Sequence, residues 1–127
     1  MQEINIPITP KTPLVKLNAD TGQLELKGRS IPENSIEFYS PVFQWIDDYS
    51  MQPKPATELH IQLEYFNTSS SKCVLDILKK LQTLHQNNRT VAKVLWYYEE
   101  DDEDMLEAGE DYQAIIRVPF EMIKIEE

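Results

Sequence analysis

Apolar and polar residues alternate along two stretches of the chain, which predicts β-strands with one buried face. Residues 59–66 alternate in this way, and so do residues 23–27, which are separated from the short run 14–17 by the turn-rich segment 18–22. Two such runs around a short polar turn are typical of a β-hairpin. Val91–Tyr98, in contrast, is nearly continuous in apolar residues. This predicts a central strand that is covered on both faces.

Two other stretches have the spacing of amphipathic helices. In the first, apolar residues recur at i, i+3, i+4 and i+7, the pattern of one helical stripe. We predict that Ser40 caps this helix and that Pro41 is its first residue, where a missing N–H costs nothing. A backward extension through Ile36–Tyr39, with a kink at Pro41, is the alternative. The second helix is predicted over Cys73–His85. The stripe of the first helix consists of Val42, Trp45, Ile46 and Tyr49.

The C-terminal part begins with an acidic run, Glu99–Asp104, in which six carboxylates follow one another. We expect this run to lead into a short helix that ends at Gly109. Ala114–Val118 has the composition of a further strand. Phe120–Ile125 is a possible last strand, since Pro119 marks a break between the two.

The order of these elements predicts an α/β fold with a mixed β-sheet, an N-terminal hairpin and helices packed on the sheet. Residues 59–98 read strand, helix, strand, so they form a central βαβ unit with parallel strands and a right-handed crossover. At 127 residues and 41% hydrophobic, the chain suffices for one core. We therefore predict a flexible N-terminal arm over residues 1–13 and a single domain over residues 14–127.

Three loops are expected to meet at one edge of this sheet. If the strand at residues 23–27 is also parallel to the βαβ unit, then the loops 28–35, 67–71 and 99–104 all follow the carboxyl ends of strands. Ligands and partners of open α/β sheets bind at such ends. The sequence thus predicts a partner surface made by these loops.

The second of these loops, residues 67–71, carries four consecutive hydroxyls, from Thr68 to Ser71. The following helix begins here with unpaired N–H groups and the positive end of its dipole. A phosphate on Thr68 would meet that helix end directly. The structural alternative is helix capping by a Ser or Thr hydroxyl, which contributes about 1 kcal/mol. Local features leave both interpretations open.

Composition and charge narrow the class of protein. Twelve basic and 22 acidic residues give a net charge of −10, which argues against binding to nucleic acid or to anionic membranes. No apolar stretch is long enough to span a bilayer, and the N-terminus lacks the apolar core of a signal peptide. We therefore expect a cytoplasmic protein.

Residues that could support catalysis are few. His60 and His85 have no Ser or Cys partner at the spacing of a catalytic triad, and no phosphate-binding or metalloprotease motif is present. Cys73 is expected to be a core or boundary residue. Glu99–Asp104 lacks the spacing of a calcium loop and is interpreted as a solvated helix start, with partner recognition as the alternative. No enzyme, metal site or cofactor is predicted.

Several segments together resemble the SiaC family of bacterial regulatory phosphoproteins. They are residues 28–38, which contain Pro32-Glu33-Asn34, residues 65–72, which contain Asn67-Thr68-Ser69-Ser70, Trp96-Tyr97-Tyr98 with the acidic segment after it, and Pro119-Phe120. The resemblance covers nearly the whole chain. It implies a fold like that of the anti-sigma-factor antagonist (STAS) domains. It also implies a phosphoacceptor at Thr68, with Ser69 and Ser70 as alternatives.

The resemblance further implies a partner-switching circuit. Its members are a serine/threonine kinase of the histidine-kinase-like ATPase fold, a PP2C-type phosphatase and a GGDEF diguanylate cyclase. The unphosphorylated form would bind and activate the cyclase, which links the chain to cyclic-di-GMP signalling and to biofilm or aggregation control. The alternatives are a constitutive scaffold protein and an anti-sigma-factor antagonist with a different effector. The residues expected to contact partners are Pro32, Glu33, Asn34, Glu37, Asn67, Ser69, Ser70 and Ser71.

Overall fold

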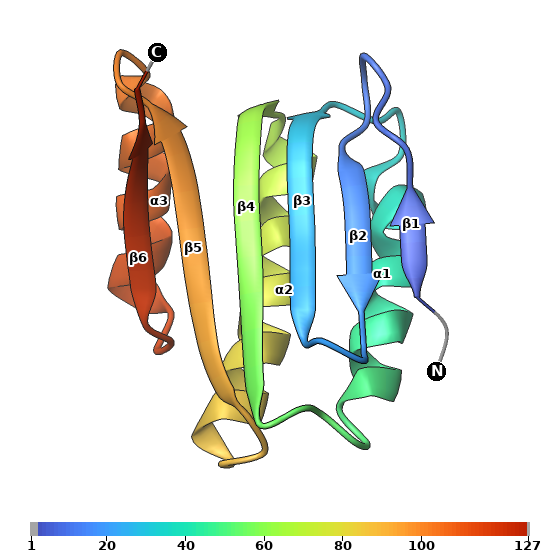
Figure 1. Ribbon diagram of the computed structural model, residues 1–127. Helices are drawn as coiled ribbons and strands as arrows, with labels where there is room; N and C mark the ends of the chain where they lie inside the picture. Colours follow the sequence, from blue (N-terminus) through green and yellow to red (C-terminus); the bar gives the residue numbers. More distant parts are fainter. Residues whose placement is uncertain (1–2, 127) are drawn as a thin grey trace.

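A six-stranded sheet runs through the computed structural model, which describes residues 3–126 (Figure 1). The strands lie side by side in chain order. The antiparallel part is formed by β1 to β3 and the parallel part by β3 to β6. The strands are β1 (Ile4–Ile6), β2 (Leu14–Asn18), β3 (Gln23–Ser30), β4 (Ala56–Phe66), β5 (Val91–Glu99) and β6 (Phe120–Ile125).

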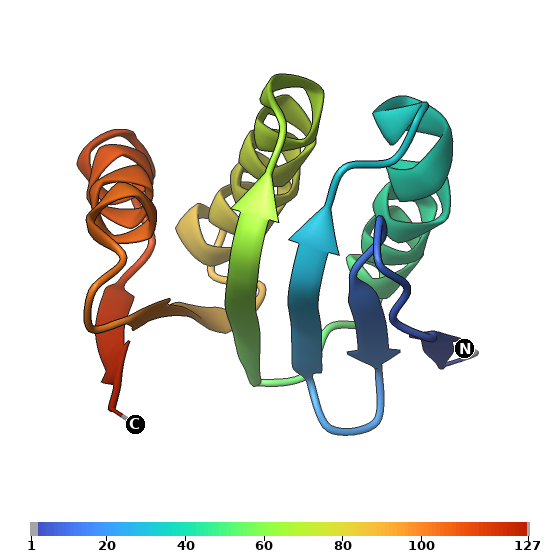
Figure 2. The ribbon, with the colours of Figure 1, turned by 90° about the horizontal axis from the view of Figure 1, so that it is seen from above.

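The helices α1 (Ser35–Tyr49), α2 (Thr68–Gln86) and α3 (Glu103–Ile115) all pack on the same face of the sheet (Figure 2). This follows from the topology, because each parallel strand is added on the same side of its predecessor and the crossovers are right-handed. The predicted α/β class, hairpin and βαβ unit are confirmed. None of the helices within residues 3–126 is long and apolar enough to cross a membrane.

The hydrophobic core lies between the sheet and this single helical layer. Leu59, Ile61 and Trp96 point into it from β4 and β5, and each is at most 1% exposed. The Trp96 indole N–H donates to the Met105 carbonyl of α3 at 3.0 Å. A Cβ at Gly109 would lie 2.5 Å from the Trp96 ring. The absence of a side chain at Gly109 therefore lets α3 approach β5.

Strand β5 corrects one prediction, because it is covered on one face only. Ala92, Val94 and Trp96 are buried, whereas Val91 is 67% exposed. Leu95 and Tyr97 are half-buried on the face that no helix covers. The apolar run was interpreted as a strand between two helical layers, but the chain-order topology leaves one layer.

The first helix begins earlier than predicted. Asn34, and not Ser40, is its N-cap, since the Asn34 side chain accepts a hydrogen bond from the Glu37 N–H at 3.1 Å. Asn34 followed by Glu37 has the spacing of a capping box, a signal that the sequence contains. Pro41 lies inside the helix, on its exposed side. The backward extension considered as the alternative is thus the observed one.

The ends of the chain bring two further corrections. Helix α3 continues past Gly109 to Ile115, so the strand predicted at Ala114–Val118 does not form, whereas the strand at Phe120–Ile125 is confirmed. Within the segment predicted as a loose arm, Ile4–Ile6 pair with β2 as an antiparallel edge strand. The register of this pair places Ile4 opposite Leu17 and Ile6 opposite Val15.

Candidate functional site

The carboxyl ends of β3, β4 and β5 point the same way, at the upper end of the sheet in Figure 1, which we call the carboxyl edge. The three segments predicted as loops all follow these ends, but residues 28–30 belong to β3 and residues 68–71 form the first turn of α2, which begins before the predicted start at Cys73. The Asn67 N–H, just after β4, donates to the Ser30 carbonyl at the end of β3 at 3.1 Å. This bond joins the segments that lead into α1 and α2.

Asn67 caps helix α2. Its side-chain oxygen accepts hydrogen bonds from the Ser70 N–H at 2.9 Å and from the Ser69 hydroxyl at 3.1 Å. Capping by a Ser or Thr hydroxyl, the structural alternative considered from the sequence, is therefore wrong, because an asparagine already fills that position. The hydroxyls from Thr68 to Ser71 are left for other contacts.

Thr68 is the first residue of α2, and its side chain is exposed. Within residues 3–126 its hydroxyl has no hydrogen-bond partner. The first turn of α2 holds no acidic side chain, so nothing in that turn neutralises the positive end of the helix dipole. Thr68 thus presents a free hydroxyl to solvent where an added phosphate is electrostatically favoured.

A chain of hydroxyl groups lies directly behind Thr68, and we call it the carboxyl-edge network. Its outer members are Ser69 and Ser35, whose oxygens are 2.7 Å apart. Ser35 also lies 3.2 Å from Ser70, and the Ser30 hydroxyl donates to Ser70 at 2.8 Å. Ser30 in turn contacts the Tyr39 hydroxyl at 2.7 Å. The network connects the starts of α1 and α2 to the end of β3.

The members of this network differ sharply in access to solvent. Ser30, Ser70 and Tyr39 are fully buried, and Ser35 is nearly so. Ser69 is exposed. Burial raises the pKa of Tyr39 to about 12, although its bond to Ser30 opposes that rise. Of the three candidate acceptors, Thr68 and Ser69 are open to a modifying enzyme in this conformation and Ser70 is not.

The predicted contact residues at the start of α1 lie beside this network. The Ser35–Ser69 contact brings residues 32–37 next to residues 67–71. Glu33 and Glu37 are exposed, while Pro32 is half-buried. Ile36, which is not among the residues expected to contact partners, is 72% exposed. The surface at the start of α1 therefore presents one apolar side chain beside the carboxylates of Glu33 and Glu37.

Ser71 links the third helix to the same edge. Its hydroxyl donates to the Thr68 carbonyl at 2.6 Å, and its own carbonyl accepts from the Tyr112 hydroxyl of α3 at 2.8 Å. Burial raises the pKa of Tyr112 to about 12, with its bond to Ser71 acting against the rise. The backbone in the first turn of α2 is thus held from α3, and the Ser69 side chain is held from α1.

The acidic run forms the end of β5 and the start of α3. Asp102 is the N-cap of α3, and its carboxylate accepts from the Met105 N–H at 3.0 Å. Glu103 and Asp104 follow in the first turn, where negative charge is favoured by the dipole. In the described part of the chain no three His, Cys, Asp or Glu side chains are placed to hold a metal ion. The run therefore has the geometry of a solvated helix start.

The remaining candidate residues lie away from the carboxyl edge. His60 contacts Tyr97 and Gln23 on the uncovered face of the sheet, and His85 accepts a hydrogen bond from the Ala92 N–H. Neither imidazole contacts a Ser or Cys side chain in the described residues. Cys73 is buried, and this burial raises the pKa of its thiol, as expected for a core residue.

Fold and site together define a small α/β protein whose distinctive chemistry is a surface hydroxyl backed by a buried polar network. The chain matches the SiaC family regulatory phosphoproteins over residues 6–125. It belongs to this family. A relative from Pseudomonas aeruginosa (strain UCBPP-PA14), Uncharacterized protein PA14_02130, is 34% identical over 120 residues, or 94% of each chain.

Solved structures agree with this assignment. SiaC of Pseudomonas aeruginosa superimposes with a TM-score of 0.90 at 31% identity, over 98% of this chain and 100% of that chain. A chain in the crystal structure of the diguanylate cyclase SiaD in complex with its activator SiaC, from the same organism, also has a TM-score of 0.90. Its identity is 32%, over 96% of this chain and 99% of that chain. These similarities extend over nearly the whole chain.

Proposed function

We propose that this chain is a non-enzymatic partner switch that is phosphorylated at Thr68 and acts in the cytoplasm. Its unphosphorylated form binds and activates a GGDEF diguanylate cyclase. The observation that carries the proposal is the exposed Thr68 hydroxyl, which has no hydrogen-bond partner within residues 3–126 and stands at the first position of α2. Membership of a regulatory phosphoprotein family supports it. So does the complex of the related SiaC with a cyclase that it activates.

Phosphorylation would change the charge of the carboxyl edge without unfolding the protein. A phosphate adds nearly two negative charges, and the dipole of α2 favours it by about 0.3–1 kcal/mol. The same edge already carries Glu33, Glu37 and the acidic run. The added charge therefore repels an acidic partner and attracts a basic one. We propose that partners recognise this change of charge on the surface formed by residues 32–37 and 67–71.

The proposed circuit contains a kinase of the histidine-kinase-like ATPase fold and a PP2C-type phosphatase. Both must reach the acceptor oxygen, which Thr68 permits. Ser69 is the second candidate, at the cost of its bonds to Asn67 and Ser35. Modification of Ser70 would require the edge to open, because Ser70 is fully buried.

The acceptor is tested by intact-mass analysis and peptide mapping of protein from native cells, before and after PP2C treatment. We expect one phosphate on Thr68 that the phosphatase removes. Absence of phosphate from residues 67–71 under every growth condition would contradict the proposal.

The switch is tested by measuring how strongly substituted proteins bind and activate the cyclase. Thr68→Ala is expected to activate the cyclase as the wild type does, and Thr68→Glu is expected to lose at least tenfold in apparent affinity. Thr83→Glu is the matched control, since it adds the same charge to an exposed threonine near the other end of α2. Equal binding by Thr68→Ala and Thr68→Glu would instead indicate a constitutive scaffold.

A further inference from the structure

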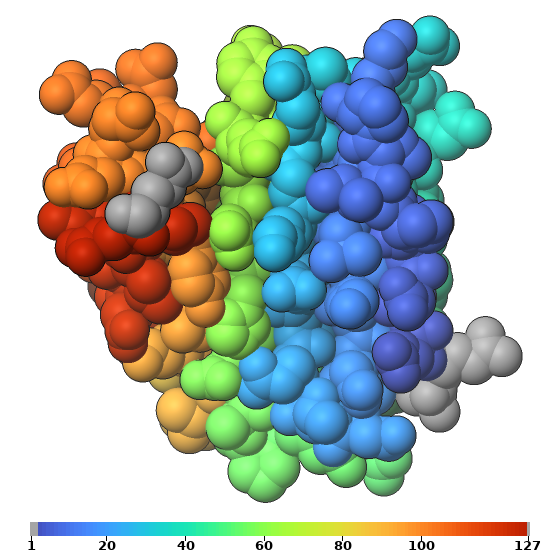
Figure 3. Space-filling view, turned by 45° about the horizontal axis from the view of Figure 1, so that its top comes forward, coloured from blue at the N-terminus to red at the C-terminus, as the bar shows by residue number. Residues whose placement is uncertain are grey.

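The face of the sheet opposite the helices is uncovered in the described part of the chain, and the strands reach the surface as adjacent bands (Figure 3). This face is not uniform. Register places Tyr97 opposite Ile123, so half-buried apolar side chains of β5 and β6 lie side by side, and Ile125 lies opposite the exposed Glu99. The corresponding positions of β3 and β4 are polar, among them Glu25 and His60.

A hollow of about 290 Å³ lies on this face, near the carboxyl edge. Tyr97 and Ile125 line one side, and Ile8 and Gly28 line the other. Gly28 has φ +118°, and a Cβ there would lie 2.6 Å from the Ile8 side chain. Glycine is thus required for Ile8 to pack over β3 and form that side of the hollow. Ile8 itself remains 55% exposed.

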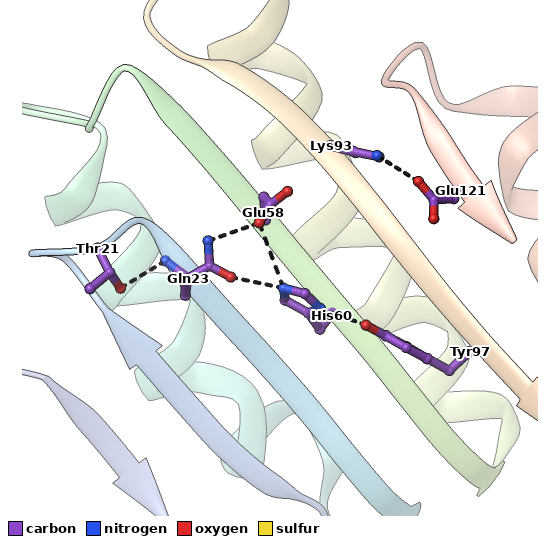
Figure 4. Close-up of polar contacts among 7 residues, drawn as sticks. All are labelled: Thr21, Gln23, Glu58, His60, Lys93, Tyr97 and Glu121. Atoms are coloured by element: carbon purple, nitrogen blue, oxygen red, sulfur yellow. Dashed lines mark hydrogen bonds and ion pairs between the residues drawn. The ribbon is translucent and has the colours of Figure 1, made fainter. Parts of the chain in front are cut away.

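The sheet next to the hollow is held by a polar chain across three strands (Figure 4). Tyr97 of β5 lies 3.0 Å from one ring nitrogen of His60, and the other ring nitrogen lies 2.8 Å from Gln23 of β3. The Gln23 amide then donates to Glu58 at 2.9 Å. These bonds fix the Tyr97 ring that lines the hollow, so the hollow exists before any partner binds.

The rim of the hollow is acidic. Glu64, Glu99 and Asp102 line it together with one cation, Lys27. Glu64 and Glu99 are exposed, and neither belongs to an ion pair within residues 3–126. The apolar side chains of Ile8, Tyr97 and Ile125 in the hollow, with unpaired carboxylates beside them, are complementary to an apolar side chain flanked by cations.

We propose that this hollow is a docking site for a basic, apolar-anchored segment of a partner protein. A leucine or phenylalanine of the segment enters the hollow, and flanking Lys or Arg side chains contact Glu64 and Glu99. At about 290 Å³ the hollow lies at the lower limit of small-molecule sites, about 300–1,000 Å³. It has room for one anchor side chain of a peptide. The hollow opens on the face of the sheet opposite the helices, and Thr68 does not line it, so it is a different surface from the one proposed around Thr68.

The experiment titrates the unmodified, full-length chain with two short capped peptides and follows backbone amides by NMR. One peptide alternates Lys and Leu around a central Phe, and the other replaces each Lys by Glu. We expect only the basic peptide to shift the amides of Gly28, Tyr97 and Ile125. Ile125→Asp should weaken its binding about tenfold or more, equivalent to about 1.4 kcal/mol.

Further variants test the acidic rim separately from the apolar anchor site. The double variant Glu64→Lys, Glu99→Lys should lose the basic peptide and gain the acidic one, with little risk to folding because both side chains are exposed. Val91→Asp is the matched control for Ile125→Asp. It also replaces an apolar residue by Asp, but Val91 is exposed and lies at the start of β5, away from the hollow. It should bind as the wild type does.

Three outcomes would overturn the proposal. The first is that neither peptide, at millimolar concentration, shifts the amide signals of the residues that line the hollow. The second is that shifts spread over the acidic surface and are unaffected by Ile125→Asp. The third is that the same amides shift with protein concentration alone, which would show that a second copy of this chain covers the face.

Discussion

Two buried hydroxyl networks lie at opposite ends of the sheet. The carboxyl-edge network holds Tyr39, near the start of α1. At the amino ends of the parallel strands, Tyr49 from the other end of α1 contacts Thr57 at 2.8 Å, and Thr57 contacts Thr90 at 2.8 Å. We call the second set the amino-edge network. Each thus contains one tyrosine of the same helix.

The two networks differ in how they end. The amino-edge network closes on backbone, because the Thr90 hydroxyl donates to the Lys54 carbonyl at 2.7 Å and the Lys54 N–H donates to the Tyr49 oxygen at 3.0 Å. The carboxyl-edge network ends at Ser69, an exposed side chain next to Thr68. The amino-edge network is thus closed within the protein. The carboxyl-edge network reaches the surface beside the proposed acceptor.

The largest expected effect concerns Tyr39 at alkaline pH. Its pKa is raised from 10.0 to about 12 in the folded protein, so the unfolded chain releases this proton first. The resulting stability is present below pH 10 and is lost as pH rises from 10 to 12. The loss amounts to about 2–3 kcal/mol. Urea unfolding at a series of pH values measures it.

Two variants check this assignment to Tyr39. Tyr39→Phe should be about 1 kcal/mol less stable than the wild type at neutral pH, because Ser30 loses a partner, and should lose less stability above pH 10. Tyr112→Phe should remove a separate part of the alkaline dependence, since burial also raises that pKa to about 12. If stability depends on pH above 10 in the same way for the wild type and Tyr39→Phe, burial of Tyr39 is not the cause of the alkaline loss of stability.

The next effect is Thr57→Val, which keeps the shape of the side chain but removes the central hydroxyl of the amino-edge network. Tyr49 and Thr90 each lose a buried partner, so we expect a loss of about 2 kcal/mol in the free energy of unfolding. Phosphorylation and cyclase activation should not change. A functional defect at equal folded concentration would show that the two ends of the sheet are coupled.

Ser35→Ala should have a smaller effect on stability, about 1 kcal/mol, because water replaces the lost partner of the exposed Ser69 and the buried Ser70 keeps its bond to Ser30. Its effect on function should be larger than that of Thr57→Val, since the Ser35–Ser69 contact positions residues 32–37 beside Thr68. Affinity for the cyclase, measured by calorimetry alongside Thr57→Val, makes the comparison. Unchanged affinity in both variants would limit the carboxyl-edge network to a structural role.

The smallest change in stability is expected for Thr68→Ala, within about 0.5 kcal/mol of the wild type. The Thr68 hydroxyl makes no hydrogen bond within residues 3–126, and Asn67 already caps the helix. The same substitution should abolish phosphorylation by the kinase. Asn67→Ala is the contrasting variant, since loss of the cap should cost about 1 kcal/mol. A destabilised Thr68→Ala protein would indicate a structural role for this threonine.

Local sequence was sufficient to predict the strand-to-helix junction and the loops that meet at the carboxyl edge. The alternating pattern of residues 59–66 and the helical spacing after Cys73 are strong, and parallel pairing then follows from the βαβ rule. Local sequence also drew attention to Thr68, because four hydroxyls in a row exceed what one cap needs.

The buried residues that contact this junction could not be predicted from the sequence. Ser30, Ser35 and Tyr39 approach Ser70 only because β3 pairs with β4 and α1 packs on α2, contacts that no short segment encodes. Gly109 was interpreted as a helix end for a similar reason, since its proximity to Trp96 is a tertiary contact. The name STAS for the fold remains a prediction.

The agreement between strand order and chain order has a consequence for how the protein folds. Every strand pairs with the one made just before it, so each parallel pairing closes one helix-containing crossover and no longer stretch of chain, and the entropy cost of closure grows with the length of chain that is closed. The sequence separation of the paired strands is therefore lower than in a parallel sheet whose strand order departs from chain order. During synthesis on the ribosome, the hairpin can form first, and each later helix and strand can then pack on the sheet in chain order. No early strand depends on a partner strand that is made much later.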